Sequence, residues 1–374
     1  MEKFILFILV ISLTLGISCA DQLGGAGSNQ AGQTNTSATQ GATQNASKWT
    51  KVELPLDRSP DVIAFGAQGR IAVAGEGILL LSLDSGQTWR SVSEGKGSNM
   101  YTTDGRKFQD ESQKDSISIA KLCSVEAAVF SRSGRLYLNT TCEHSSALWS
   151  LPTENISDPW YVRAFAPSPE QFEKSGDYSS PGRNLIATSR RVLVDGRLSN
   201  ETVLFTTEDQ GASWQPLWRD SLGPRIVGLD FIDEHNGWML QAEGKLLRTQ
   251  DGGSTWVANG TLPANAVGRV VSIEFVNPTT GIAVGQEGLI LTTKDGGRSW
   301  QQQISDTKAS LSRAAGVDEN NAWVVGESGT LLETNDGGRS WQMHSLGVDE
   351  DIQTITVNNG VAWLVAGRNV YRSK

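Results

Sequence analysis

Short apolar runs alternate with polar, glycine-rich breaks along residues 48–374. The unit RVVSIEFVNPTTGIAVGQEGLILTTKDGGRSW, residues 269–300, shows the pattern: VVSIEFV, IAVG and LILTT read as strands, and a fourth strand begins at Trp300. β-Branched residues, short runs and glycine-rich turns indicate strands, and no segment keeps a helical period over a dozen residues. The pattern predicts an all-β protein built from units of four antiparallel strands.

A polar octet of the form S/T-x-D-x-G-x-S/T-W ends the third strand of these units. It occurs five times, at residues 82–89, 207–214, 249–256, 293–300 and 334–341. The last three intervals between its tryptophans are 42, 44 and 41 residues, and the first, of 125 residues, is close to three periods. A period in the low forties with four strands per unit predicts a β-propeller.

The count of first strands predicts seven blades. These strands are expected near Val62, Val125, Val162, Ile226, Val270, Ala314 and Ile352. The last blade lacks a fourth strand, and residues 48–54 resemble the strand that follows an octet. We expect this N-terminal strand to join the C-terminal blade, which would close the ring and remove its open edges. Residues 93–117 are polar and are expected to form an inserted loop, so that the propeller spans residues 48–374.

The octet resembles the Asp-box, or BNR repeat, in which an aspartate accepts backbone N–H bonds inside a turn and a tryptophan packs between layers. A calcium loop is the alternative, but it needs several more oxygen side chains at fixed spacing, and the repeated pattern itself offers one carboxylate. A structural role is therefore favoured, with local hydrogen bonding by the acid and burial of the indole. The residues concerned are Asp84, Asp209, Asp251, Asp295, Asp336, Trp89, Trp214, Trp256, Trp300 and Trp341.

The complete repeats carry a more specific resemblance. Runs such as GLDFIDEHNGWMLQAEGKLLRTQDGGSTW and IEFVNPTTGIAVGQEGLILTTKDGGRSW look like the repeats of the photosystem II stability/assembly factor family. The resemblance covers about residues 215–374 and the first blade, and it is poor over residues 90–206. It implies a seven-bladed propeller, lipid-anchored in cyanobacteria and lumenal in plastids, that acts as a chaperone and scaffold for reaction-centre subunits. Similar repeats occur in bacteria without photosynthesis, so the motif specifies the fold more strongly than the client.

The first 47 residues indicate export. Lys3 precedes an apolar run that is too short to cross a bilayer, so residues 1–18 read as a signal peptide. LGISC resembles a bacterial lipobox with Cys19 as the lipidated residue, although Gly16 stands where an aliphatic residue is usual. The alternative is an ordinary signal peptide cleaved near Ala20. Residues 19–47 are polar and read as a flexible tether, which places the propeller at a membrane on its periplasmic, lumenal or outer side.

The cysteines, the net charge and the histidines give further predictions about a disulfide and about the classes of ligand. Cys123 and Cys142 flank an expected hairpin, and a disulfide between them would contribute about 3 kcal/mol; two free buried thiols are the alternative. The net charge of −9 argues against a nucleic-acid partner. The three histidines have no ligand spacing, so neither a metal nor another cofactor is expected. We expect a monomer.

Three arginines define the candidate partner-binding site. Arg225, Arg269 and Arg313 are each 44 residues apart and precede or open a first strand, so they are expected to ring one mouth of the central channel. Arg58 lies near the equivalent place in the first blade. Such a ring suits a carboxylate-bearing partner. In the alternative, the arginines pair with the glutamates of the second turns, which are Glu76, Glu243 and Glu287.

These features predict a non-catalytic, protein-binding scaffold that assists assembly or stability of a membrane protein complex. A subunit of the photosystem II reaction centre is the client that the resemblance implies. An adhesion or receptor propeller of unknown ligand is an alternative. A sialidase-like glycosidase is a weaker one, because it needs a tyrosine nucleophile and an F/Y-R-I-P signature, whereas the chain has five tyrosines and lacks that signature.

Overall fold

The structure is a computed structural model. It describes residues 48–54, 56, 58–91, 99–101, 124–142, 145–151, 153, 161–164, 181–198, 201–208, 211, 214–221 and 223–374. The chain divides into two units, Met1–Gln40 and Gly41–Lys374, and every described residue belongs to the second. The predicted signal peptide, Cys19 and the tether lie outside the described residues, as does most of the predicted loop at 93–117.

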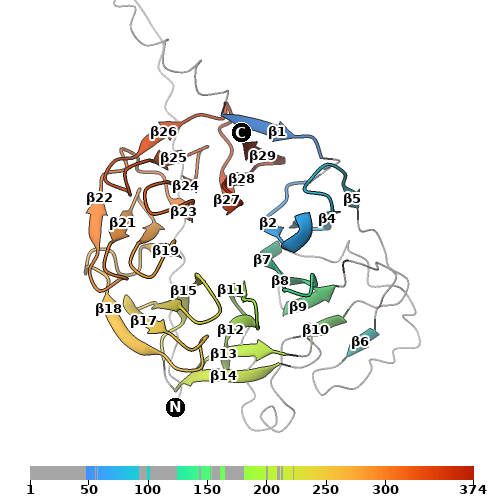
Figure 1. The fold of residues 1–374 in the computed structure, drawn as a ribbon, viewed down its shortest axis with the longest axis horizontal. Coiled ribbons are helices and arrows are strands. Elements are labelled where there is room, and N and C mark those ends of the chain that lie inside the picture. Colours follow the sequence, from blue (N-terminus) through green and yellow to red (C-terminus); the bar gives the residue numbers. More distant parts are fainter. Residues whose placement is uncertain are drawn as a thin grey trace, which may run out of the picture. The chain divides into compact units, whose positions relative to one another are not determined.

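The second unit is a seven-bladed β-propeller, as the repeats predicted (Figure 1). Blade 1 consists of β2 (Val62–Phe65), β3 (Ile71–Gly75), β4 (Ile78–Ser82) and β5 (Arg90–Ser91), with a 3-10 turn, η1 (Ala67–Gly69), between β2 and β3. Blade 2 consists of β7 (Ser124–Phe130), β8 (Leu136–Cys142), β9 (Ser145–Leu151) and β10 (Tyr161–Ala164), with β6 (Asn99–Tyr101) parallel to β10 at its outer edge. Blade 3 consists of β11 (Pro181–Ala187), β12 (Val192–Leu198), β13 (Glu201–Thr207) and β14 (Gln215–Asp220).

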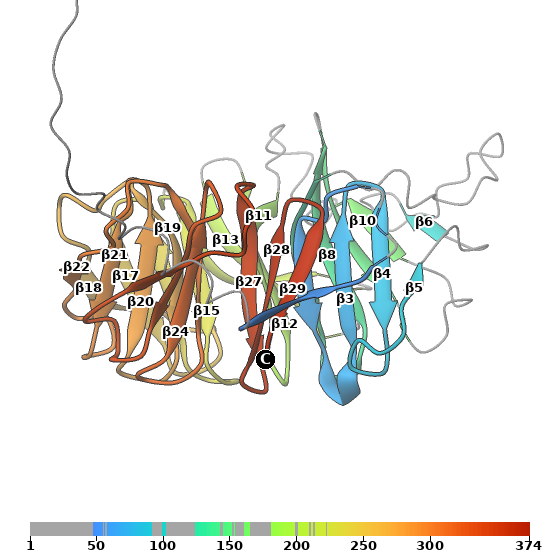
Figure 2. The same cartoon turned by 90° about the horizontal axis from the view of Figure 1, so that it is seen from above.

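Blades 4 to 6 are the most regular. Blade 4 consists of β15 (Ile226–Phe231), β16 (Gly237–Gln241), β17 (Lys245–Thr249) and β18 (Val257–Thr261). Blade 5 consists of β19 (Val270–Phe275), β20 (Gly281–Gly285), β21 (Ile290–Thr293) and β22 (Gln301–Gln303). Blade 6 consists of β23 (Leu311–Gly316), β24 (Ala322–Gly326), β25 (Leu331–Thr334) and β26 (Gln342–His344). In each of these blades the strands run antiparallel, and the first strand lies at the central opening (Figure 1). Figure 2 shows the ring from the side, with the strands running between its two faces.

Blade 7 closes the ring with strands from both ends of the propeller. It consists of β27 (Ile352–Asn358), β28 (Val361–Ala366), β29 (Asn369–Ser373) and β1 (Trp49–Val52). β1 pairs antiparallel with β29, with Trp49 opposite Ser373 and Val52 opposite Val370. The predicted closure by the N-terminal strand is therefore confirmed.

One first strand was assigned wrongly from the sequence. Val162 lies on β10, the fourth strand of blade 2, and blade 3 begins with β11. Blade 2 has no octet to mark the end of its third strand. An apolar segment such as residues 161–164 therefore reads equally well as an outer or an inner strand.

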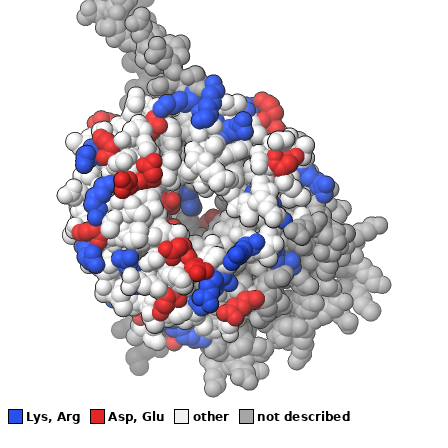
Figure 3. Space-filling view, in the orientation of Figure 1, with Lys and Arg blue, Asp and Glu red and all other residues white. Residues whose placement is uncertain are grey.

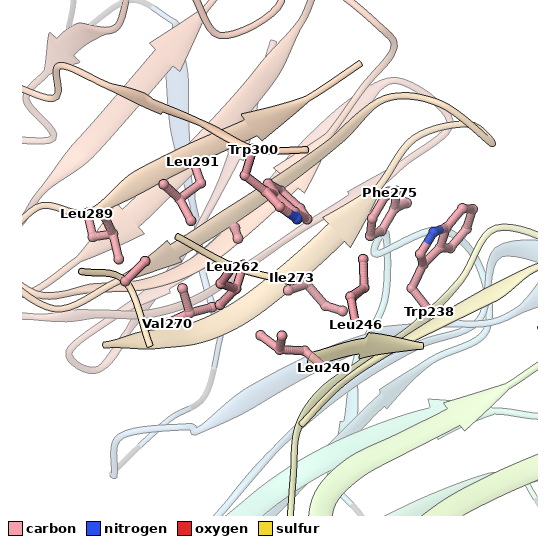
Figure 4. Packing of buried hydrophobic residues seen from close by; sticks show 12 residues of the cluster. Trp238, Leu240, Leu246, Leu262, Val270, Ile273, Phe275, Leu289, Leu291 and Trp300 are labelled. Atoms are coloured by element: carbon pink, nitrogen blue, oxygen red, sulfur yellow. The ribbon is translucent and has the colours of Figure 1, made fainter. Parts of the chain in front are cut away.

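Aromatic side chains fill the space between neighbouring blades. Trp238 of β16 is fully buried and stacks on Phe275 of β19, with 4.0 Å between ring centroids and 6° between ring planes. Phe275 also meets Trp300 edge-on at 6.0 Å, so a single cluster joins blades 4 and 5 (Figure 4). Trp323 and Trp363 are buried at the equivalent places in blades 6 and 7. Burial of these apolar surfaces between blades drives the ring together.

No helix within the described part of the chain is long and apolar enough to cross a membrane.

Candidate functional site

The Asp-box turns use their carboxylates internally. Asp336 accepts hydrogen bonds from the hydroxyls of Thr334 (2.9 Å) and Ser340 (2.6 Å) and from the N–H groups of Arg339 (2.9 Å) and Ser340 (3.0 Å). The Ser340 hydroxyl, followed by the Ser340 N–H, lowers the pKa of Asp336 to about 2. Gly338 adopts a φ of 84°, which a side chain would strain. With its oxygens occupied in this way, the carboxylate holds the turn.

The other described copies repeat these contacts. Asp84, Asp251 and Asp295 each accept from the hydroxyl two residues before them and from the hydroxyl and N–H four residues after them. Asp209 lies outside the described residues. The octet tryptophans pack on neighbouring rings: Trp214 on Tyr137, Trp256 on Phe231 and Trp300 on Phe275. Trp89 and Trp341 join the hydrophobic clusters between blades.

The predicted arginines do not form one ring. We call the side of the propeller where first strands begin the start face, and the opposite side the Asp-box face. The N–H groups of Ala242 and Gln286 donate to the carbonyls of Arg225 and Arg269, each at 3.0 Å, so these two arginines hold equivalent positions. In blade 6 the matching bond runs from Glu327 to the carbonyl of Ser310, at 2.9 Å.

The predicted place of Arg313 in this ring is therefore wrong. Ser310 is the residue equivalent to Arg269, and Arg313 lies three positions further along, inside β23. The 44-residue spacing that connects the three arginines is misleading because the repeat from blade 5 to blade 6 is shorter than the one before it. Arg313 instead lines the central channel. Basic and acidic side chains are visible at the central opening in Figure 3.

The remaining arginines of the start face differ in their partners. Arg269 forms an ion pair with Glu287 at 3.1 Å and donates to the carbonyls of Asn265 and Gln286. Arg58 lies 4.0 Å from Glu76, and both side chains are largely exposed. The side chain of Arg225 is exposed and makes no hydrogen bond or ion pair to any residue that the structure describes. The alternative prediction, pairing with a glutamate, thus holds for Arg269, and for Arg58 the exposed pair is a weak one.

A groove of about 610 Å³ adjoins Arg225 on the start face. Its polar lining includes Glu126, Asp195, Gln241 and Gln286, and residues of blades 3, 4 and 5 form most of its wall. Its apolar lining includes Val271, which is 44% exposed. A free guanidinium beside side-chain amides and an exposed aliphatic surface can bind an extended polypeptide that carries a carboxylate.

Asp195 is the residue of this groove that the sequence analysis missed. Its side chain is 5% exposed and accepts a hydrogen bond from the Asn184 N–H at 2.8 Å. Burial raises the pKa of Asp195 to about 7, although that hydrogen bond and the charge of Arg225 oppose the rise. A single acid inside the apolar run VLVDG is the signal that could have identified it.

The channel holds a second group of charges, on the first strands. Asp230 accepts from the Phe275 N–H at 2.6 Å, and Glu274 accepts from the Gly316 N–H. Burial raises the pKa of Asp230 to about 6 and that of Glu274 well above its usual value, and the positive charge of Arg313 opposes both shifts. Each carboxyl bonds the first strand of the next blade, so these residues tie blades 4, 5 and 6 together around the channel.

Other site predictions stay untested. Cys142 ends β8, but Cys123 and the side chain of Cys142 are outside the described atoms, so the disulfide remains a prediction. Within the described ranges, no group of three or more His, Cys, Asp or Glu side chains could hold a metal ion.

The fold and its turns define a class: a seven-bladed β-propeller with Asp-box repeats and a charged groove on one face. A family model described as photosynthesis system II assembly factor YCF48 matches residues 206–310 and 303–370. The chain is therefore similar to that family, as the repeats indicated, and the match itself covers the C-terminal part of the ring. No curated protein matches the chain.

Solved structures share the architecture. YCF48 from Cyanidioschyzon merolae has a TM-score of 0.62 and 14% identity, covering 87% of this chain and 98% of its own. YCF48 bound to D1 peptide has a TM-score of 0.60 and 16% identity, covering 87% and 94%. The GH74 xyloglucanase from Xanthomonas campestris has a TM-score of 0.58 and 12% identity, covering 87% and 53%. At these identities the similarity shows the fold alone.

Proposed function

We propose that this protein is a non-catalytic binding scaffold that assists assembly or stability of a membrane protein complex. The observation that carries the proposal is the groove beside Arg225, on a propeller whose C-terminal repeats match the YCF48 family model. The related YCF48 that was solved with a D1 peptide supports a polypeptide client. A reaction-centre subunit of photosystem II is the specific client that this proposal names.

Binding in the groove would depend on the exposed guanidinium of Arg225. A carboxylate of the client would accept two N–H hydrogen bonds from this guanidinium. Gln286, which is exposed in the same wall, offers its side-chain amide to the client backbone. Asp195 also lines the groove, as a buried acid. The arrangement favours an anionic group at the rim and apolar contact with Val271.

The test replaces Arg225 with glutamate. Loss of a charge-assisted contact weakens binding by about tenfold or more, so Arg225→Glu should lose client subunits in a pull-down from solubilised host membranes and weaken binding of a D1 peptide measured by fluorescence anisotropy. Arg368→Glu is the matched control, since Arg368 is also exposed and lies on the start face, in the turn between β28 and β29. Equal binding by both variants, each with an unchanged melting temperature, would refute the groove as the client site.

Two other functions are weaker. An adhesion or receptor propeller would use the same groove for an extracellular ligand, and the pull-down would then recover no membrane complex. A glycosidase of the sialidase type needs a reactive tyrosine, whereas burial, followed by the charge of Glu350, raises the pKa of Tyr371. A raised pKa disfavours the phenolate that such a nucleophile requires.

The same proposal places the propeller at a membrane, on its periplasmic, lumenal or outer side. Its support is the sequence of residues 1–47, with Cys19 as the lipidated residue. We expect Cys19→Ser to move the protein from the membrane fraction to the soluble fraction of host cells, because one missing anchor removes most of the membrane affinity. A variant that still sediments with the membrane would contradict lipidation at Cys19.

A further inference from the structure

A second polar pocket lies on the Asp-box face, where blade 4 meets blade 5. It measures about 420 Å³, and its lining includes Arg248 of β17, Arg298 of the next Asp-box turn, Thr255, Asn259 and Val257. None of these residues lines the groove beside Arg225. The pocket is therefore separate from the proposed client site, and an inference about it does not depend on that proposal.

Arg248 lacks the backbone acceptor that an arginine has at the preceding junction, between blades 3 and 4. There, Arg191 donates to the carbonyl of Gly252 at 3.3 Å and to the hydroxyl of Ser254 at 3.2 Å. Gly296 holds the position of Gly252 in the next repeat. Its carbonyl already accepts from the Trp238 indole at 2.9 Å and from the Asn259 amide at 2.7 Å.

Two donors fill the acceptor capacity of a carbonyl, so Arg248 is left without this bond. Its guanidinium makes no hydrogen bond to any described residue, and its Nε is buried without a partner. It lies over the Trp238 ring, 5.1 Å from the centroid, on the buried aromatic stack shown in Figure 4. This contact places the guanidinium over the indole ring and leaves its N–H groups available to a ligand.

Arg298 supplies a second cation to the same pocket. One of its N–H groups donates to the Asp295 carbonyl at 3.2 Å, which anchors the side chain to its own turn. Asp251 also lines the pocket, but it accepts from the hydroxyls of Thr249 and Thr255 and from the Thr255 N–H. Two guanidiniums against one carboxylate that is engaged in its turn give the pocket a net positive charge.

We propose that Arg248 and Arg298 bind a carboxylate group, such as that of an acidic side chain on a partner protein. A guanidinium presents two parallel N–H groups in one plane, which match the two oxygens of a planar carboxylate. Val257, which is 63% exposed, and Ala258 provide an apolar surface for the methylene groups of that side chain.

Acetate is the simplest probe of this site. In ¹⁵N spectra, the Trp238 indole and Arg248 Nε–H resonances should shift saturably as sodium acetate replaces sodium chloride at constant ionic strength. Sodium sulfate, which carries a tetrahedral anion, should bind more weakly than acetate. Shifts that do not saturate, or equal affinity for sulfate, would overturn the proposal of a carboxylate site.

Three variants locate the binding groups. Arg248→Lys keeps the charge but loses the paired donors, and Arg298→Gln removes an exposed cation; each should weaken acetate binding by about tenfold. Arg339→Gln is the matched control, because Arg339 is exposed at the same Asp-box position in blade 6, and it should bind acetate as the unmodified protein does. If Arg248→Lys is too unstable to study, Arg298→Gln decides alone. Unchanged binding by Arg298→Gln, or an equal loss in Arg339→Gln, would refute the site.

Discussion

At the scale of single residues, three carboxyls that are wholly or partly buried play two structural roles. Asp61 accepts the Val125 N–H at 2.8 Å and Asp230 accepts the Phe275 N–H, so each joins its blade to the next. Asp195 stays within its own blade and bonds Asn184. Burial dominates the electrostatics of all three and raises their pKa values. The folded protein therefore holds these protons more tightly than the unfolded chain does.

This difference predicts how stability depends on pH. Because the pKa of Asp195 is raised to about 7, its protonation adds stability that is complete below pH ~4 and is lost as pH rises through 7. Asp195→Asn removes this titration, while its amide oxygen can still accept from Asn184. We expect the variant to be more stable than the unmodified protein at pH 8, by on the order of 2 kcal/mol, and to differ less at pH 5.

Urea unfolding at the two pH values measures this effect. Asp349→Asn, at an exposed position, is the control and should retain the stability loss between pH 5 and pH 8. Asp230, with a pKa raised to about 6, contributes a loss of the same sign, so some slope should remain in Asp195→Asn. A slope identical to that of the unmodified protein would show that Asp195 does not hold its proton in the folded state.

At the scale of elements, the turns were more predictable than the strands around them. The octet contains the hydrogen-bond donors and acceptors of its own turn within eight consecutive residues, so the Asp-box geometry follows from local chemistry. Arg313 shows the limit. Its place depends on a repeat that is three residues shorter than its neighbour, and no local signal in the first strand records that change. The outer strand at Val162 was misplaced for a different reason, because no octet precedes it.

The Asp-box turn of blade 6 provides a direct test. Asp336→Ala removes four hydrogen bonds. Because the turn is at the surface and water can replace part of them, the free energy of unfolding should fall by about 1–2 kcal/mol. Thermal melting of Asp336→Ala beside the exposed control Asp349→Ala measures the difference, and binding through Arg225 should survive at permissive temperature. Lost binding with an unchanged melting temperature would show that the turn contacts the client.

At the scale of the whole molecule, the ring was predictable and the groove was not. A period in the low forties, four strands per unit and a missing outer strand in the last blade determine seven blades and their closure. The groove brings together Glu126, Asp195, Arg225 and Gln286 from four different blades. Their proximity depends on how blades are packed around the axis, which no single repeat encodes. Arg225 was found because it precedes a first strand, whereas Asp195 lies within a second strand.

The closure of blade 7 also brings two distant points of the chain together. The Lys374 N–H donates to the Lys48 carbonyl at 2.9 Å, beside the pairing of Trp49 with Ser373. A short peptide linker could therefore join residue 374 to residue 48 and make the circle covalent. The chain could then be opened in a connection between two other blades, such as residues 304–309, as in a circular permutant. The order of the blades would be kept, and blade 7, which is now assembled from both ends of the propeller, would become continuous. The position of the new chain break, rather than the order of the blades, would then decide where the ring first opens.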